Sequence, residues 1–252
     1  MQYDIKDDLK IACINQLIIE NKTLLGVTEE GRKATKIVIP DDVTSIGEKA
    51  LYSCTMLTSI IMPSNLDTIG SYALMDCDKI KSITLPDSVK EIENSAFMKC
   101  SSLESLTIPN KVTEISRYLF EECESLTTVA IPESVKKIDD SAFFSCTSLK
   151  DINIPSSVEF IGDRVFVNCK SLESIVIPEG VKSIGEECFF DCGNLKSVVI
   201  PSSVKSIGEY SFDRCNKLTD IYVDQEKNDL LLNTKYPKKC IIHWNSKDPT
   251  SL

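Results

Sequence analysis

Hydrophobic residues recur along most of this chain with a fixed period of about 23 residues. A short alternating run, such as Ile175-Val-Ile177, ends at a proline, and two further apolar residues follow, for example Val181 and Ile184. A small residue and an aromatic residue come next, as in Ala142-Phe143, and then a cysteine and a leucine. The template reads I-x-I-P-x-x-V-x-x-I-G-x-x-A-F-x-x-C-x-x-L-x-x. A fixed period of this length is the signature of a tandem-repeat protein.

The proline and the cysteine of the template show how regular the repeat is. Prolines recur at the same position of eight successive units: Pro40, Pro63, Pro86, Pro109, Pro132, Pro155, Pro178 and Pro201. Cysteines recur with the same spacing in these eight units: Cys54, Cys77, Cys100, Cys123, Cys146, Cys169, Cys192 and Cys215. Eight units in phase predict one elongated solenoid, because each unit stacks on its neighbours and shares a continuous core with them.

Each unit is expected to begin with a β-strand. In Ile152-Asn-Ile154 and Ile175-Val-Ile177, β-branched residues alternate and both isoleucines face one side, which is the period of a strand. The proline that follows cannot donate to a ladder, so it ends the strand and starts a turn. Val181 and Ile184 are expected to point back into the core. The pair Ala142-Phe143 is predicted to lie on a short helical turn, with the phenylalanine in the middle of the coil.

The position after the last isoleucine predicts a turn with an unusual backbone angle. Five units carry glycine there: Gly47, Gly70, Gly162, Gly185 and Gly208. The other three units carry Glu93, Ser116 and Asp139, which adopt a positive φ less cheaply than glycine. Either the turn does not demand a positive φ, or these three residues are mildly strained.

Residues 1–36 lie before the repeat and are expected to cap the solenoid. Two apolar runs, Ile11–Ile19 and Leu24–Val27, flank a polar break and predict a hairpin. Such a hairpin would cover the open end of the core, as the terminal units of a solenoid require. The repeat itself is predicted to span residues 37–223 in eight units.

Residues 224–252 are predicted to form a C-terminal cap and tail. The repeat breaks after Val223, where Asp224 replaces the proline. The runs Leu230–Leu232 and Cys240–Trp244 supply apolar material, and Trp244 is expected to shield the last coil. The final residues, 246–252, are expected to be frayed.

Charge and cysteine content narrow the classes of partner and compartment. The chain has 28 basic and 38 acidic residues, a net charge of −10, which disfavours nucleic acid and anionic lipid surfaces as partners. Eight of the 11 cysteines occur one per unit. In-register coils place them in a parallel row roughly 5 Å apart, a poor geometry for disulfides. We expect a reduced, buried cysteine ladder that serves as small apolar filler.

The sequence predicts no catalytic residue, no metal site and no cofactor. The one histidine, His243, lies outside the repeats, so the solenoid has no nucleophile–histidine pair. The cysteines form a line, whereas zinc needs ligands that converge on a point. The first residues carry charge and no apolar core of a signal peptide, and no apolar run approaches the ~18 residues of a membrane span.

The template resembles the BspA-type, also called Treponema pallidum-type, class of leucine-rich repeat, over about residues 37–223. The resemblance implies an α/β-type repeat solenoid, mostly β and right-handed, with a parallel concave sheet and short helical turns opposite. Family members are similar to adhesins on the surfaces of anaerobic bacteria and some parasitic protists. The resemblance therefore implies a cell-surface or secreted protein that binds a host or extracellular-matrix protein; a cytoplasmic location is the alternative.

A binding face follows from the direction of the isoleucines. If they face inward, the residues between and before them line the solvent side of the sheet. The predicted contact residues are Thr84, Thr107, Thr128, Asp151, Asn153, Val176, Val199 and Tyr222. An exposed, nearly uncharged stripe is often an interaction site, although such residues also simply suit strands. The leading hypothesis is a non-catalytic protein-binding module. The alternative is an intracellular structural scaffold or a self-associating spacer.

Overall fold

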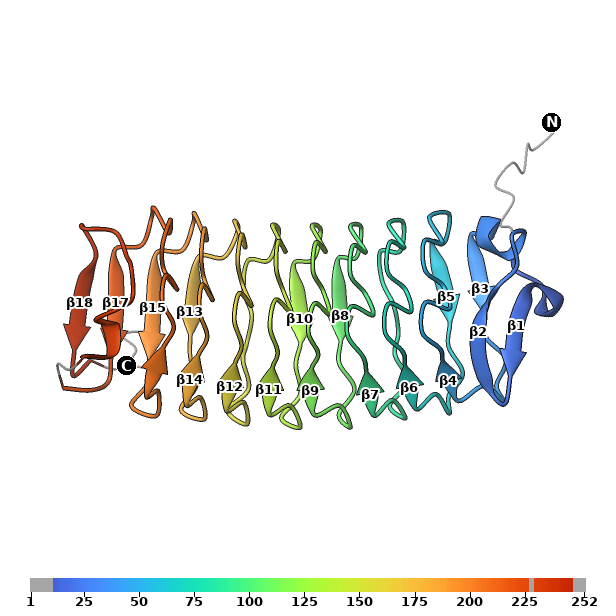
Figure 1. Ribbon diagram of the computed structural model, residues 1–252, viewed down its shortest axis with the longest axis horizontal. Helices are drawn as coiled ribbons and strands as arrows, with labels where there is room; N and C mark the ends of the chain where they lie inside the picture. Colours follow the sequence, from blue (N-terminus) through green and yellow to red (C-terminus); the bar gives the residue numbers. More distant parts are fainter. Residues whose placement is uncertain (1–10, 227–228, 247–252) are drawn as a thin grey trace, which may run out of the picture.

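The structure, a computed structural model, describes residues 11–226 and 229–246. The coils stack along one axis, with an N-terminal hairpin at one end and strand β18 (Ile241–Trp244) at the other (Figure 1). Each coil places its short strands in parallel with those of its neighbours, and register partners such as Ile175 and Val198 lie one period apart in the sequence. The predicted mostly-β solenoid with parallel strands is confirmed.

The first ladder of strands is formed by the alternating run before each proline. The middle residue of each run, such as Ile175 or Val198, points into the core, and its neighbours point outward. The strands are β3 (Lys36–Val38), β5 (Ser59–Ile61), β8 (Ser105–Thr107), β10 (Thr128–Ala130), β13 (Ser174–Val176), β15 (Ser197–Ile200), β17 (Asp220–Val223) and β18.

The first ladder is interrupted at two coils. Ile152 and Ile154 are buried, but residues 151–155 form no strand, so the strand predicted there is wrong. At the coil of Ile83 a single bridge between Ser82 and Ser105 replaces a strand pair. The inward direction of the isoleucines is set by burial in the core, and it persists where the ladder hydrogen bonds are missing.

Each coil contributes to a second parallel ladder, which was not predicted, in the segment that follows the proline. It is formed by the isoleucine of the V-x-x-I segment and the residue before it, and the isoleucine faces the core. The strands are β4 (Ser45–Ile46), β6 (Thr68–Ile69), β7 (Glu91–Ile92), β9 (Glu114–Ile115), β11 (Lys137–Ile138), β12 (Phe160–Ile161), β14 (Ser183–Ile184) and β16 (Ser206–Ile207). The inward valine and isoleucine were predicted correctly.

The segment around Ala142-Phe143 is a series of turns, so the predicted helical turn is wrong. Two residues of this coil, Ser141 and Ser145, have φ of 55° and 58°, and a left-handed residue cannot continue a right-handed helix. Their N–H groups donate to Asp163 O and Val167 O of the next coil, each at 2.8 Å. Within the described residues, the short 3₁₀ helices η1 (Ile14–Gln16), η2 (Gly31–Lys33) and η3 (Asp229–Leu231) lie outside the eight units.

Of the two alternatives for the glycine position, the first is correct. No glycine has a positive φ, and neither do Glu93, Ser116 and Asp139, so the turn does not demand an unusual backbone angle. A Cβ built on Gly185 would lie 2.4 Å from the carbonyl carbon of Gly162, the equivalent position of the preceding coil. At Gly185 the close approach of two backbones therefore leaves no room for a Cβ without a shift, whereas other coils accommodate Glu93, Ser116 and Asp139 at this position.

Two columns of side chains run along the core. The rings of Phe97, Phe120, Phe143, Phe166, Phe189 and Phe212 stack with centroids 5.3–5.8 Å apart. Beside them, seven of the eight phased thiols donate to a backbone carbonyl of the preceding coil, at 3.0–3.3 Å, as Cys146 Sγ does to Phe120 O. All 11 cysteines are free, and burial raises the thiol pKa of Cys146 well above its usual range. The predicted reduced, buried ladder is confirmed.

The predicted N-terminal hairpin is present. Its strands β1 (Leu17–Glu20) and β2 (Thr23–Val27) pair antiparallel, and β2 then pairs in parallel with β4 of the second ladder. The hairpin thus continues the stack of coils at this end.

The C-terminal segment adds one more rung to the first ladder. After η3 the chain returns as β18, which pairs in parallel with β17 and sets Ile241 opposite Asp220, an offset slightly shorter than one period. Trp244 packs against the core, whereas Leu232 is 74% exposed and supplies no core material. Most of the predicted frayed tail, residues 247–252, lies outside the described residues. The boundaries of the two cap segments stay predictions.

Candidate protein-binding face

The structure places every predicted contact residue on the solvent side of the first ladder. We call this surface the outer face: the outward residues of β3, β5, β8, β10, β13, β15, β17 and β18 and of the two interrupted coils. The exposed members of the predicted set are Thr84, Thr107, Thr128, Asp151, Asn153 and Val176, and the half-buried members are Val199 and Tyr222. The predicted outward direction is therefore correct for all eight residues.

The C-terminal strands bring three of the predicted residues together. Val176, Val199 and Tyr222 are register partners on the adjacent strands β13, β15 and β17, so they form a continuous row. Val176 is 49% exposed. Because this row is apolar and neighbouring strands lie about 4.8 Å apart, the outer face offers here an apolar strip three strands wide.

The same row continues onto His243, which the sequence analysis did not place on this face. His243 is the register partner of Tyr222, and their rings stack with centroids 4.5 Å apart. His243 Nε2 lies 2.8 Å from Asp220 Oδ1, and this hydrogen bond lowers the pKa of Asp220. The offset between β17 and β18 is shorter than one repeat, so the repeat pattern did not predict that His243 lies on this face. The bulky residues Ile241-Ile242-His243-Trp244 are typical of a strand.

Other parts of the outer face are less continuous. Asp151 and Asn153 lie in the coil without a strand, so no ladder hydrogen bonds join them to Thr128 or Val176. At the N-terminal end, Val38 and Ile61 are exposed register partners on β3 and β5. The face thus has two apolar ends separated by a polar middle.

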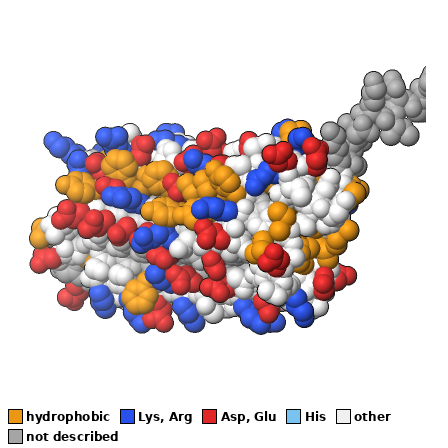
Figure 2. Space-filling view, turned by 45° about the vertical axis from the view of Figure 1, so that its right-hand side comes forward, with side chains coloured by type: hydrophobic (Ala, Val, Ile, Leu, Met, Phe, Trp, Pro, Cys, Tyr) orange, Lys and Arg blue, Asp and Glu red, His pale blue; other side chains and the backbone are white. Residues whose placement is uncertain are grey.

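Charge on the molecule lies mostly outside this ladder. Figure 2 shows one face on which acidic, basic and hydrophobic side chains are interspersed, with hydrophobic side chains gathered in a band along its upper half. Many charged residues pair between adjacent coils, such as Lys90 with Asp67 at 3.0 Å and Lys196 with Glu173 at 2.6 Å. These pairs are exposed to solvent, so each contributes little to stability.

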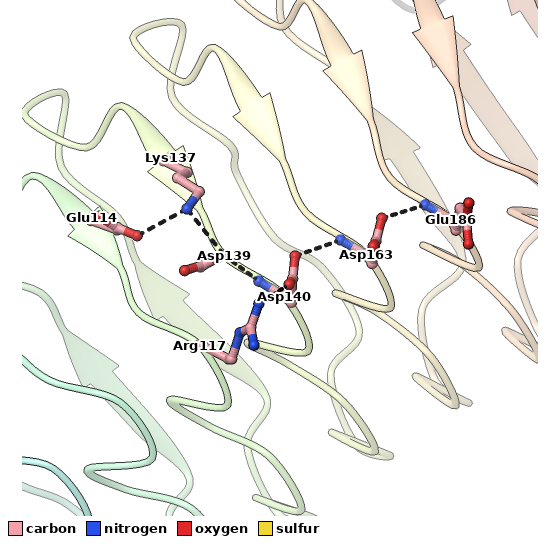
Figure 3. Close-up of polar contacts among 7 residues, drawn as sticks. All are labelled: Glu114, Arg117, Lys137, Asp139, Asp140, Asp163 and Glu186. Carbon is pink, nitrogen blue, oxygen red and sulfur yellow. Dashed lines mark hydrogen bonds and ion pairs between the residues drawn. The ribbon is translucent and has the colours of Figure 1, made fainter.

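The row of acidic residues beside the second ladder has an internal role (Figure 3). Asp140 Oδ1 accepts the backbone N–H of Asp163 at 3.0 Å, and Asp163 Oδ1 accepts that of Glu186 at 2.8 Å. Arg117 pairs with Asp140. Partial burial acts to raise the pKa of Asp139, but the N–H of Asp140 and pairing with Lys137 outweigh it and lower that pKa. These carboxylates fasten one coil to the next.

The described part of the chain contains no group of three or more histidine, cysteine, aspartate or glutamate side chains arranged to hold a metal ion. A hollow of about 450 Å³ is lined by Asp76, Asp78, Glu122, Glu124 and Lys99, among others. Its carboxylates carry like charge and are open to solvent. Across 11–226 and 229–246, no helix has the length and apolar character that crossing a bilayer requires.

Comparison with solved structures places this geometry among bacterial leucine-rich repeat proteins. The T. pallidum leucine-rich repeat protein is 26% identical over 83% of this chain and 91% of that chain, with a TM-score of 0.56. The pneumococcal vaccine antigen PcpA is 20% identical over 90% of this chain and 72% of that chain, with a TM-score of 0.52, a likeness of fold alone. A leucine rich cell surface protein from Faecalibacterium prausnitzii is 26% identical over 79% of this chain and 81% of that chain, but its TM-score of 0.44 is too low for a functional comparison.

No curated protein matches the chain. The family model described as "BspA type Leucine rich repeat region" matches in six copies, over residues 29–150 and 137–234. These segments include the strands of both ladders except β18, and also the phenylalanine column and the phased cysteines. The chain therefore belongs to the BspA-type leucine-rich repeat family.

Proposed function

We propose that this protein is a non-catalytic protein-binding module whose partner docks on the outer face of the first ladder. The observation that carries the proposal is the row Val176, Val199, Tyr222 and His243, which lies in register on four adjacent strands with no described segment covering it. An apolar row of this kind, with one aromatic ring already stacked and fixed, suits the centre of a protein interface.

The polar middle of the outer face would serve as the border of such an interface. Thr84, Thr107 and Thr128 present hydroxyl groups that can both donate and accept hydrogen bonds. Asp220, the acidic residue beside the apolar row, already pairs with His243. A partner would therefore meet little unpaired charge in the row.

The finer part of the proposal concerns the partner and the location. Membership of the family supports an adhesin-like role, in which a cell-surface or secreted protein recognises a host or extracellular-matrix protein. The repeat family and its solenoid of near-identical coils support a non-catalytic role. No cofactor is part of the proposal. An intracellular scaffold or spacer remains the alternative function.

A pull-down tests both parts at once. The intact protein serves as bait against a panel of host extracellular-matrix proteins and against a lysate of the cells that produce it. Specific capture of a matrix or cell-surface protein is the expected result. Capture of intracellular proteins only would refute the adhesin-like role and leave the scaffold.

The outer face is tested separately with the captured partner. A variant with Val176→Lys and Tyr222→Lys should lose binding, because both substitutions place charge in the apolar row. Thr68→Lys and Ser183→Lys, two residues beside core-facing isoleucines of the second ladder, form the matched control and should bind normally. Equal binding by both variants would refute the outer face as the docking site.

A further inference from the structure

The two ladders end in four places, and three of these ends are protected from further strand pairing. At the N-terminal end of the first ladder, Ile11 bridges to Lys36 of β3, and Ala12 N–H donates to Lys36 O at 2.9 Å. At the N-terminal end of the second ladder, the outer strand β1 has an irregular register between Ile18 and Ile19 and ends on a charge, Glu20. Bulges and charges are the usual protection of sheet edges.

The C-terminal end of the second ladder is covered as well. The 3₁₀ helix η3 packs beside β16. Gln225 Nε2 donates to Val204 O at 2.8 Å and to Pro201 O at 3.2 Å, which occupies carbonyls of the last regular coil. The fourth end, β18, differs from these three.

Within the described residues, β18 is the last strand of its sheet and pairs only with β17. Ile241 N–H donates to Thr219 O at 2.7 Å, so it points toward β17. Because bonding directions alternate along a parallel strand, the N–H groups of Ile242 and Trp244 point to the open edge. The edge thus presents two backbone donors and the carbonyl of Ile242 in strand geometry.

The side chains at this end are also incompletely covered. Ile242 and Trp244 are the register partners of Ile221 and Val223, which are fully buried, yet both are only half-buried. Ile241, on the outer face, is 59% exposed. An open, uncharged strand edge beside uncovered apolar side chains is a template for another strand.

We propose that β18 pairs antiparallel with β18 of a second copy of this chain, about a twofold axis at Ile242. Residues opposite each other in an antiparallel pair share a face, so an axis at Ile242 sets Ile241 opposite His243 of the second copy and keeps inner and outer faces continuous. The two Ile242 residues exchange both of their N–H···O bonds across the axis.

The distribution of charge favours a second copy in this orientation. The chain carries a net charge of −10, but β18 has no acidic or basic residue apart from His243, which is paired with Asp220. The exposed Lys238 and Lys239 precede the strand. Antiparallel pairing about Ile242 sets Lys239 opposite Asn245 of the second copy. Lys238 and Lys239 of one copy therefore lie at the opposite end of the paired strands from those of the other copy, so the lysines do not repel each other.

The contact is small, and the dimer is accordingly weak. Four residues of strand and one end of the solenoid bury less than a standard protein–protein interface, so we expect a Kd on the order of 100 µM. Higher ionic strength should tighten the dimer, because salt screens the repulsion between two acidic copies. A twofold pair leaves no further β18 edge free, so association stops at the dimer.

Sedimentation equilibrium of the full chain, from about 5 to about 500 µM, tests this proposal against the expected Kd. The wild-type protein should pass from monomer to dimer. Ile242→Pro should weaken the dimer by about tenfold or more, because it removes two intermolecular hydrogen bonds and no internal one. Ile242→Ala keeps the edge N–H and controls for the lost side chain. Ile61→Lys, on the outer face far from β18, should dimerise normally.

Three results would overturn the proposal: a monomer at all concentrations, species larger than a dimer, or association that Ile242→Pro leaves unchanged. Circular dichroism checks that the proline variant is folded. If it is not, hydrogen exchange of the wild-type protein decides: the amides of Ile242 and Trp244 should become protected in concentrated protein. Their equal exchange in dilute and concentrated protein would refute pairing through β18. Neither experiment involves the partner of the outer face, so this proposal and the proposed function can fail separately.

Discussion

Phe143→Leu should destabilise the protein more than Phe97→Leu does. Both side chains are fully buried, and both substitutions remove the same atoms. Phe143 stacks on two rings, Phe120 at 5.3 Å and Phe166 at 5.5 Å, whereas Phe97 stacks only on Phe120, at 5.8 Å, and is the first ring of the column. The coil before it carries Leu74, which is also fully buried, so leucine is a tolerated side chain in this column.

The expected magnitudes follow from these contacts. Replacing a buried phenylalanine by leucine removes three carbons, or about 2 kcal/mol at about 0.8 kcal/mol per buried carbon. Each ring pair adds about 0.5–1.5 kcal/mol beyond its area. Phe143→Leu should therefore cost about 3–5 kcal/mol and Phe97→Leu about 2.5–3.5 kcal/mol, a difference of one ring contact.

Urea unfolding followed by circular dichroism measures both free energies of unfolding. Both substitutions should leave the slope of the unfolding free energy against urea concentration unchanged, so that a shift of the midpoint reports a change in stability alone. If the two variants lose equal stability, or Phe97→Leu loses more, ring stacking does not stabilise the column and the reasoning fails.

Three further predictions concern the cysteines, the glycines and the effect of pH. Thiol labelling of the native protein should be fast at the exposed Cys13, slow at the eight phased cysteines and complete after unfolding; fast native labelling of the phased cysteines would contradict their burial. Gly185→Ala should cost about 1–3 kcal/mol, because its Cβ meets the preceding coil at 2.4 Å. Gly193→Ala, whose Cβ would meet only Lys170 Cδ at 4.0 Å, should change stability by no more than about 0.5 kcal/mol in urea unfolding; equal losses would refute the role of close approach. The lowered pKa of Asp220 adds stability that is fully present above the unfolded pKa of about 3.9 and is lost as pH falls through the folded pKa. The stability difference between the wild-type protein and Asp220→Asn should therefore shrink in acid, and a difference that grows below that pH would contradict the assignment.

The inward half of each coil could be predicted from the sequence because burial depends only on the period. Ile175, Val181 and Ile184 fall on the core side wherever the hydrogen bonds run, and all three are buried. The phased cysteines were predicted for the same reason. A residue that recurs once per period in an in-register stack meets its own equivalent in the next coil.

The remaining features depend on backbone geometry that a residue pattern does not carry. The left-handed residues Ser141 and Ser145 are of a type that also fits a helical turn, so the turn was mistaken for a helix. Gly185 suggested a positive φ, but glycine fits there because the backbone of Gly162 in the preceding coil lies too close for a Cβ. The second ladder was missed because two residues, such as Ser183 and Ile184, are too few to show an alternation.

The candidate outer face was predictable in direction but incomplete in extent. Tyr222 was expected on it, but His243 was not, because the chain reaches the last rung slightly before a full period has passed. The 23-residue period predicts which residues lie on the outer face only where the coils keep that length. The stacked pair that ends the outer face lies just beyond that point.

The most direct test of the protein-binding claim is a titration of the captured partner against two variants of the full chain, followed by isothermal titration calorimetry. One variant carries Thr107→Lys, Val176→Lys and Tyr222→Lys on the outer face, and the other carries Thr68→Lys, Ser183→Lys and Ser206→Lys along the second ladder. The account predicts that the first variant loses measurable affinity and that the second binds like the wild-type protein. Wild-type affinity of the first variant would contradict the account.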